Sequence, residues 1–258
     1  MKIIKKYLLL IIAVVIVLIL GITYALGFRV GPGLKIERVG TLIITGLPVN
    51  ATVYVDNVLR STITKPGNTK NELVAGSHTI IVSAPGDYPW STIVSVTSRK
   101  TTTVNPIFVG MQPVATVLTG TDRDAALAAI ASTSLPTLDH PIYLANGCAV
   151  VYVSNNQIIA DATTTPGCTP PPYLCDNGTC SPTIIYSPIP KLSAVIKFPH
   201  RQDALVFEFG NVVLAIALDP RSPQFFAPVL TATAPVMGAL PDGTLVIHNG
   251  NSVFKIAL

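Results

Sequence analysis

The chain has 258 residues, of which 12% are charged and 49% hydrophobic, and its formal net charge at pH 7 is +4. Three of its 17 basic residues, Lys2, Lys5 and Lys6, lie at the extreme N-terminus, so the other 14 nearly balance the 13 acidic residues. This balance excludes the basic surface that nucleic-acid binding requires. The abundance of Thr, Ser, Asn, Pro, Val and Ile predicts an all-β fold with many turns.

An uncharged apolar run extends from Leu8 to Leu26. As a helix it would be roughly 28 Å long, close to the about 30 Å hydrocarbon core of a bilayer. We therefore predict that residues 1–28 form a short tail and a single transmembrane anchor, with the lipid bilayer as partner through Leu8–Leu26. The preceding lysines favour a cytoplasmic N-terminus and an extracytoplasmic bulk of the chain. The alternative is a cleaved signal peptide, for which Ala25-Leu26-Gly27 is a weak site and the apolar run is long.

Residues 29–39 form a predicted linker, and residues 40–110 form a predicted module of short strands. Turn signals such as Pro66-Gly67 and Pro85-Gly86 separate the apolar runs, which favours a small antiparallel β-sandwich. Trp90 is the single tryptophan and is interpreted as a core residue. The expected strands are Thr41–Thr45, Thr52–Val55, His78–Val82, Thr92–Val96 and Thr103–Val109.

Several motifs in this module resemble the PEGA domain family. The strand Thr52-Val-Tyr-Val55 with its turn Asp56-Asn57 follows Pro48 and Ala51, and the segments Leu73–Val82 and Ala84–Tyr88 fit later features of the family. The sequence departs from the family at Pro48-Val-Asn-Ala51, where the name-giving tetrapeptide falls, and at Asn57, where Gly is usual but Asn tolerates positive φ. The resemblance implies a β-sandwich module of prokaryotic surface proteins, used as a spacer or binding module, with no catalytic residues.

Residues 111–258 are predicted to contain one helix near 122–132 and a repeated β unit. Thr121 and Asp124 approximate a capping box before an alanine-rich run. Each repeat is a three-stranded meander with a tight hairpin turn, and the units resemble β-propeller blades only weakly; a sandwich is the other arrangement. The chain ends inside a strand pattern, so unpaired edges make self-association an alternative to a closed form. The hairpin turns are Asn155-Asn156, Gly210-Asn211 and Gly250-Asn251.

A proline-rich insertion at residues 162–190 interrupts the repeats and holds three of the four cysteines. Outside the membrane these should form disulfides, and the spacing fits zinc poorly, so we expect no metal. Of three connectivities, we favour Cys148–Cys168 with Cys175–Cys180. The insertion is also the candidate binding loop, with Tyr173, Asp176 and Asn177 as contact residues.

The sequence contains no recognisable catalytic motif, no metal-binding histidine spacing and no cofactor motif. Because binding residues concentrate in loops on rigid scaffolds, we expect a non-enzymatic cell-surface protein, a structural, binding or adhesion module of the envelope. An envelope glycan or another surface protein would be its partner. The alternative is an extracytoplasmic enzyme acting on envelope glycans, which would require two convergent carboxylates or a metal in a cleft. Glu208 or Asp161 close to a second acid in a pocket would favour this alternative.

Overall fold

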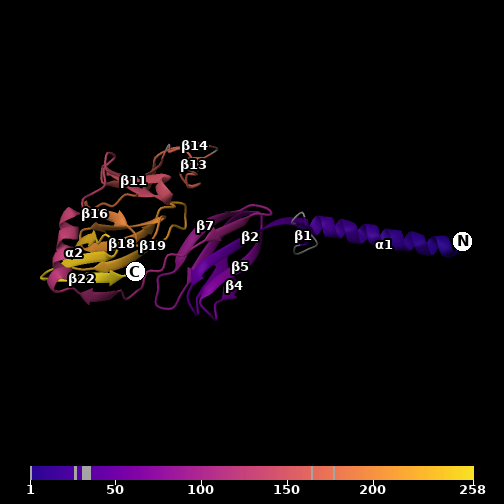
Figure 1. The fold of residues 1–258 in the computed structure, drawn as a ribbon, viewed down its shortest axis with the longest axis horizontal. Helices are drawn as coiled ribbons and strands as arrows, with labels where there is room; N and C mark the ends of the chain where they lie inside the picture. The colour runs from indigo at the N-terminus through magenta and orange to yellow at the C-terminus, as the bar shows by residue number, and fades with distance from the viewer. Residues whose placement is uncertain (1, 26–27, 31–35, 164, 177) are drawn as a thin grey trace. The chain divides into compact units, whose positions relative to one another are not determined.

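A computed structural model describes residues 2–25, 28–30, 36–163, 165–176 and 178–258, with side chains described for all of these except 2–10, 29, 30, 36 and 176. The described chain is mostly β, as predicted, and its small sheets form no closed barrel (Figure 1). The chain divides into two compact units. The first unit comprises Met1–Ile80 and Ile93–Pro106, and the second comprises Ile81–Thr92 and Ile107–Leu258.

The N-terminal helix α1 comprises Lys2–Ala25. Among the residues described in full, no helix has the length and hydropathy needed to cross a membrane. Of the span predicted from Leu8 to Leu26, Leu26 and the side chains of residues 8–10 lie outside the described residues.

Two four-stranded sheets form the module after α1. In the first, the long strand β2 (Ile36–Leu47) pairs antiparallel with β1 (Phe28–Val30) and β5 (Gly67–Val74), and parallel with β8 (Thr101–Val104). The second has the order β4 (Val58–Thr62), β3 (Thr52–Val55), β6 (Gly76–Ser83) and β7 (Trp90–Val96). Alternate residues are buried in both sheets, for example Leu42 and Ile44 in β2 and Val53 and Val55 in β3, because successive side chains of a strand point to opposite faces.

The sequence missed three of these strands, β1, β4 and β5, and extended another too far. Most of β1 and the first residues of β2 fall within the predicted linker 29–39, so that part of the linker is strand. β4 and β5 are polar and largely exposed, so they lack the apolar run by which a strand is predicted from sequence. The predicted strand Thr103–Val109 ends at Val104, just before Asn105 and Pro106, because proline has no N–H for the ladder. The turn at Asp56-Asn57 has φ of 51° and 64°, which confirms that Asn57 adopts the left-handed conformation.

The second unit contains three four-stranded antiparallel sheets. The first sheet has the order β10 (Ile142–Leu144), β11 (Ala149–Ser154), β12 (Gln157–Ala162) and β15 (Thr183–Tyr186). The second has the order β16 (Leu192–Lys197), β17 (Ala204–Phe209), β18 (Val212–Ala217) and β19 (Phe226–Thr231). The third has the order β20 (Val236–Ala239), β21 (Leu245–Asn249), β22 (Ser252–Ala257) and β9 (Val114–Val117).

The three predicted meanders are confirmed, and each sheet has a fourth strand that lies outside its meander. In the third sheet this strand is β9, which lies far earlier in the sequence and pairs Val114 with Ala257 and Ala115 with Ile256. The last strand, β22, is therefore an interior strand of its sheet. The open edge expected at the end of the chain, which was the argument for self-association, does not exist at β22.

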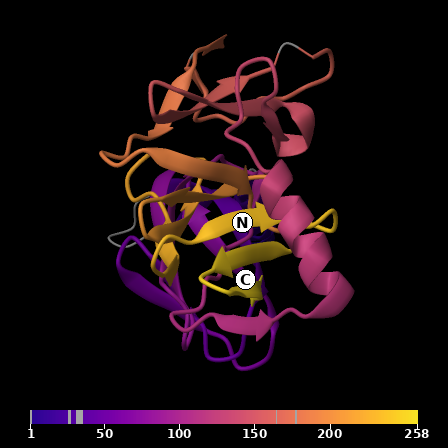
Figure 2. The ribbon, with the colours of Figure 1, turned by 90° about the vertical axis from the view of Figure 1, so that its left-hand side faces the viewer.

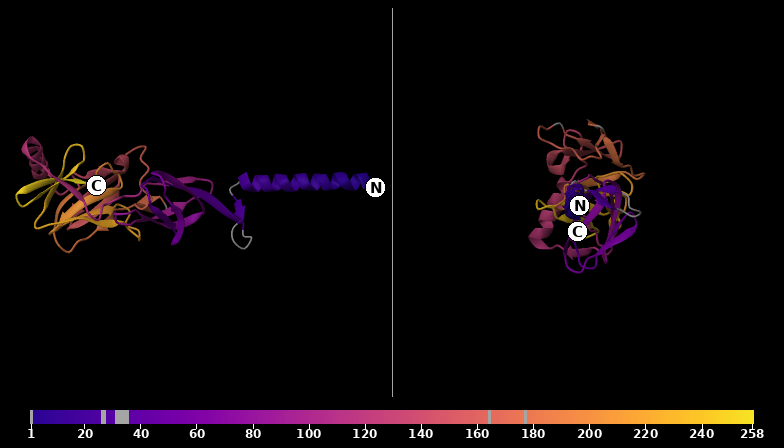
Figure 3. Two further views of the ribbon diagram at one scale, coloured as in Figure 1. Left: turned by 90° about the horizontal axis from the view of Figure 1, so that it is seen from below. Right: turned by 90° about the vertical axis from the view of Figure 1, so that its right-hand side faces the viewer.

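The helix α2 (Gly120–Ser132) covers the third sheet (Figures 2 and 3). Its buried Ala126 and Ile130 pack with Val246 and Val253 of β21 and β22. The N-cap is Thr119, and its side chain forms no capping hydrogen bond. The capping box predicted at Thr121 is therefore wrong, and the helix begins two residues earlier than expected.

Candidate functional site

Both disulfides of the preferred connectivity are present, which confirms the predicted pairs Cys148–Cys168 and Cys175–Cys180. The second pair closes a small hairpin, β13 (Cys175–Asp176) with β14 (Thr179–Cys180). Thr163 fastens the start of the loop further, because its hydroxyl donates to the Gly147 carbonyl at 2.7 Å. The insertion is thus held to the first sheet at its base and clamped at its tip.

Tyr173 and Leu174 dock the insertion onto the core of the second unit. Leu174 is 2% exposed, and Tyr173 packs against the same buried cluster. Burial, together with the nearby carboxylates of Asp219 and Asp203, raises the pKa of the Tyr173 hydroxyl well above its ordinary value. The phenol therefore stays neutral and anchors the loop. Of the other predicted contact residues, Asn177 and the side chain of Asp176 lie outside the described residues.

Two arginine–aspartate pairs lie beside this anchor. Arg201 binds both carboxylate oxygens of Asp203 at 2.8 Å, and Arg221 binds Asp219 in the same way. The hydrogen bond and charge of Asp219 raise the pKa of Arg221 further, against the effect of burial. Since partly exposed ion pairs contribute little stability, these pairs mainly fix the carboxylates of Asp203 and Asp219 near Tyr173.

The two acids named for a catalytic role have structural partners. Glu208 is 3% exposed in β17 and accepts a hydrogen bond from the Met237 N–H at 2.8 Å. Burial raises the pKa of its carboxyl, and hydrogen bonds to Met237 and Ser193 partly offset that rise. Because Met237 lies in β20, at the edge of its sheet, Glu208 satisfies an edge N–H that would otherwise be unpaired. Asp161 accepts from the N–H of its neighbour Ala162 at 2.8 Å.

His78 forms the tightest polar cluster of the first unit. Its Nδ1 lies 2.6 Å from Asp56 Oδ2, and its Nε2 lies 2.7 Å from the Val74 carbonyl oxygen. Asp56 also accepts from the Thr79 N–H at 3.0 Å. The two ring nitrogens thus hold the imidazole between a carboxylate of one turn and a carbonyl of a neighbouring strand. Burial raises the pKa of Asp56, but the hydrogen bonds from His78 and Thr79 lower it by more.

The described residues contain no group of three His, Cys, Asp or Glu side chains that could hold a metal ion.

A pocket of about 300 Å³ lies in the second unit, where the end of α2 meets β10 and β16. Its polar wall consists of Ser132, Thr133, Ser134, His140 and Lys197. Its apolar wall consists of Pro136, Ile142, Val195 and Ile196.

Sequence reasoning missed this pocket because two segments more than fifty residues apart form it. Within either segment the residues are unremarkable: a polar helix end before Pro136, and an apolar strand that ends at Lys197. The structure places the exposed His140 in the lining of this pocket.

Residues 39–109 match the family model described as the PEGA domain. This match confirms the resemblance inferred from the motifs between residues 40 and 110. No curated protein matches the chain.

Proposed function

We propose that this protein is a membrane-anchored, extracytoplasmic component of the cell envelope that acts by binding rather than by catalysis. The PEGA match at residues 39–109 supports a role as a surface module. Two disulfides support an oxidising compartment, because disulfides persist outside the cytoplasm and are rare within it.

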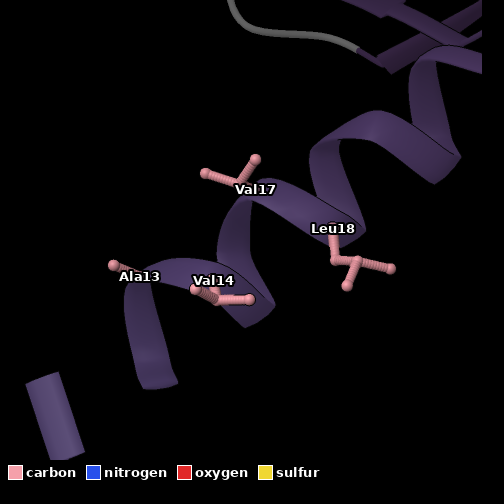
Figure 4. A pocket seen from close by; sticks show the side chains of 4 residues that line it. All are labelled: Ala13, Val14, Val17 and Leu18. Atoms are coloured by element: carbon pink, nitrogen blue, oxygen red, sulfur yellow. The ribbon is translucent and has the colours of Figure 1, made fainter. Parts of the chain in front are cut away.

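The proposed anchor is the segment from Leu8 to Leu26. It carries no charge, and the apolar side chains described in α1 are exposed. The exposed fraction ranges from 46% for Ile12 to 69% for Val17. Figure 4 shows how Ala13, Val14, Val17 and Leu18 project from the helix. A bilayer would cover such a surface, and the lysines before it favour a cytoplasmic N-terminus.

The observation that carries the binding role is the loop of residues 163–182. The Cys148–Cys168 disulfide and the buried Leu174 hold it to the core of the second unit, and the Cys175–Cys180 disulfide clamps its tip. A loop restrained in this way loses little conformational entropy when it binds. More of the free energy of its contacts therefore contributes to affinity. We propose that it contacts an envelope glycan or another surface protein.

We also propose a propeller-like or sandwich-like arrangement of the three sheets in the second unit. The first strand of the second sheet, β16, contacts the first strands of the other two, β10 and β20. When meanders are arranged around a common axis, their first strands lie nearest to that axis and contact one another.

Protease treatment of intact cells tests the anchor. The full chain with a C-terminal tag should lose the tag to externally added protease, while a tag at the N-terminus remains protected. A C-terminal tag that is cut only after the membrane is opened would contradict the proposed orientation.

A binding screen of the full chain, purified in detergent, tests the function. It should bind isolated envelope polysaccharide or a surface protein, and the double variant Cys175→Ser with Cys180→Ser should bind more weakly. The matched control is Ser181→Ala, which changes an exposed residue next to the hairpin and leaves the clamp intact. Equal binding by the disulfide variant would remove the loop from the contact surface.

A further inference from the structure

The pocket between α2, β10 and β16 has a positive wall. Lys197 and His140 line it, and no carboxylate does. The Lys197 ammonium donates to the Gln202 side-chain oxygen at 3.4 Å, a long hydrogen bond, and no acid among the described residues pairs with it. A positive group without a counter-ion at the wall of a cavity favours an anionic ligand.

The hydroxyls at the end of α2 add acceptors to this wall. Ser132 and Thr133 each donate their hydroxyl proton to the Ala129 carbonyl, both at 2.9 Å. Their oxygens therefore offer lone pairs, since a hydroxyl has one proton and two acceptor positions. A ligand that satisfies these oxygens must carry hydrogen-bond donors as well as a negative charge. Inorganic phosphate is mainly an acceptor and fits this wall poorly.

The rest of the lining is apolar and comes from Pro136, Ile142, Val195 and Ile196. It suits the C–H face of a saturated ring. At about 300 Å³ the pocket is at the lower end of the range for small-molecule sites, which limits it to about one ring.

We infer that this pocket binds a sugar unit that carries a carboxylate, that is, a uronic acid residue. The carboxylate contacts Lys197 and His140, the ring hydroxyls donate to Ser132 and Thr133, and the ring face lies on the apolar wall. This inference rests on the proposed binding function and specifies its ligand class.

Titration calorimetry with the full chain in detergent tests the inference, with D-glucuronate, D-glucose and inorganic phosphate as probes. D-Glucuronate should bind at least tenfold more tightly than either of the others. Lys197→Gln should lower its affinity at least tenfold, and His140→Gln should lower it less. The matched control is Lys191→Gln, since Lys191 is an exposed lysine just before the same strand, and it should leave the affinity unchanged.

Three results would overturn the inference: no binding of D-glucuronate, equal binding of phosphate, or full affinity in both pocket variants. The same proteins are then tested on isolated envelope polysaccharide. If the wild type binds the polysaccharide and Lys197→Gln binds it equally well, the proposed function stands and the pocket assignment falls. If D-glucuronate binds the pocket but no envelope component binds the chain, the proposed envelope function falls and the site remains.

Discussion

The contact between α2 and β20 predicts that Gly238→Ala destabilises the helix. A Cβ at position 238 would lie 2.8 Å from the Ile130 Cα, 2.9 Å from the Ile130 N and 3.0 Å from the Thr133 hydroxyl. Two of these atoms belong to the helix backbone, which has no rotamer to change. The helix must therefore move away from the sheet by several tenths of an ångström.

The expected cost follows from what this movement disrupts. The buried residues of α2 are Ala126 and Ile130, which pack with Val246 and Val253 in a small cluster that the partly buried Leu127 also joins. Because this cluster is small, a shift of the helix loosens much of its packing. Overpacking of a well-packed contact costs about 1–3 kcal/mol, and the reduced entropy of the unfolded chain returns about 0.4–1 kcal/mol. The net loss should be about 1–2 kcal/mol.

Hydrogen exchange of the peptide that covers residues 120–132 measures this loss locally. A loss of about 1–2 kcal/mol corresponds to exchange roughly 5–30 times faster. The matched control is Gly110→Ala in the same unit, where the nearest atom to a new Cβ is the Gln112 carbonyl oxygen at 3.6 Å, an ordinary contact. If the two variants exchange at the same rate as the wild type in α2, the close approach has no energetic consequence and the reasoning fails.

Two further predictions concern pH and have opposite signs. In the first unit the pKa of Asp56 is lowered on folding, so its contribution is present above its ordinary pKa and is lost as the pH falls through the lowered value. Asp56→Asn should therefore cost roughly 1 kcal/mol at pH 7, after allowance for solvent exposure, and nothing at a pH below the lowered pKa. Trp90 begins β7, which lies in the same sheet as the strand β3 just before Asp56, so Trp90 fluorescence in urea measures this cost, and an equal cost at both pH values would contradict the prediction. In the second unit burial raises the pKa of Glu208, so its folded state binds the proton more tightly and loses stability as the pH rises from the ordinary pKa through the raised one. Glu208→Gln should remove this part of the pH dependence in thermal melts between pH 4 and pH 8, and an unchanged profile would show that the carboxyl does not titrate in that range.

Local features of the sequence determined the β-rich class, the hairpin turns and the PEGA resemblance, and they favoured the pairing of Cys175 with Cys180. Each depends on a few neighbouring residues. For example, Cys175 and Cys180 flank a short turn, and the left-handed residues Asn155 and Asn156 form a hairpin because Asn tolerates positive φ. Apolar runs with period two identify strands directly.

Only the tertiary structure decided which strands and side chains meet across the chain. A period-two pattern shows that β22 is a strand, but it does not show that one edge of β22 pairs with β9, more than a hundred residues earlier in the chain. The sequence shows Glu208 only as an acidic residue within a strand. It accepts the hydrogen bond of an edge strand because β20 places the Met237 N–H next to it. The pocket likewise exists only because packing brings Lys197 to the end of α2. These contacts follow from the packing of whole sheets, and residues distant in sequence carry no local signal of it.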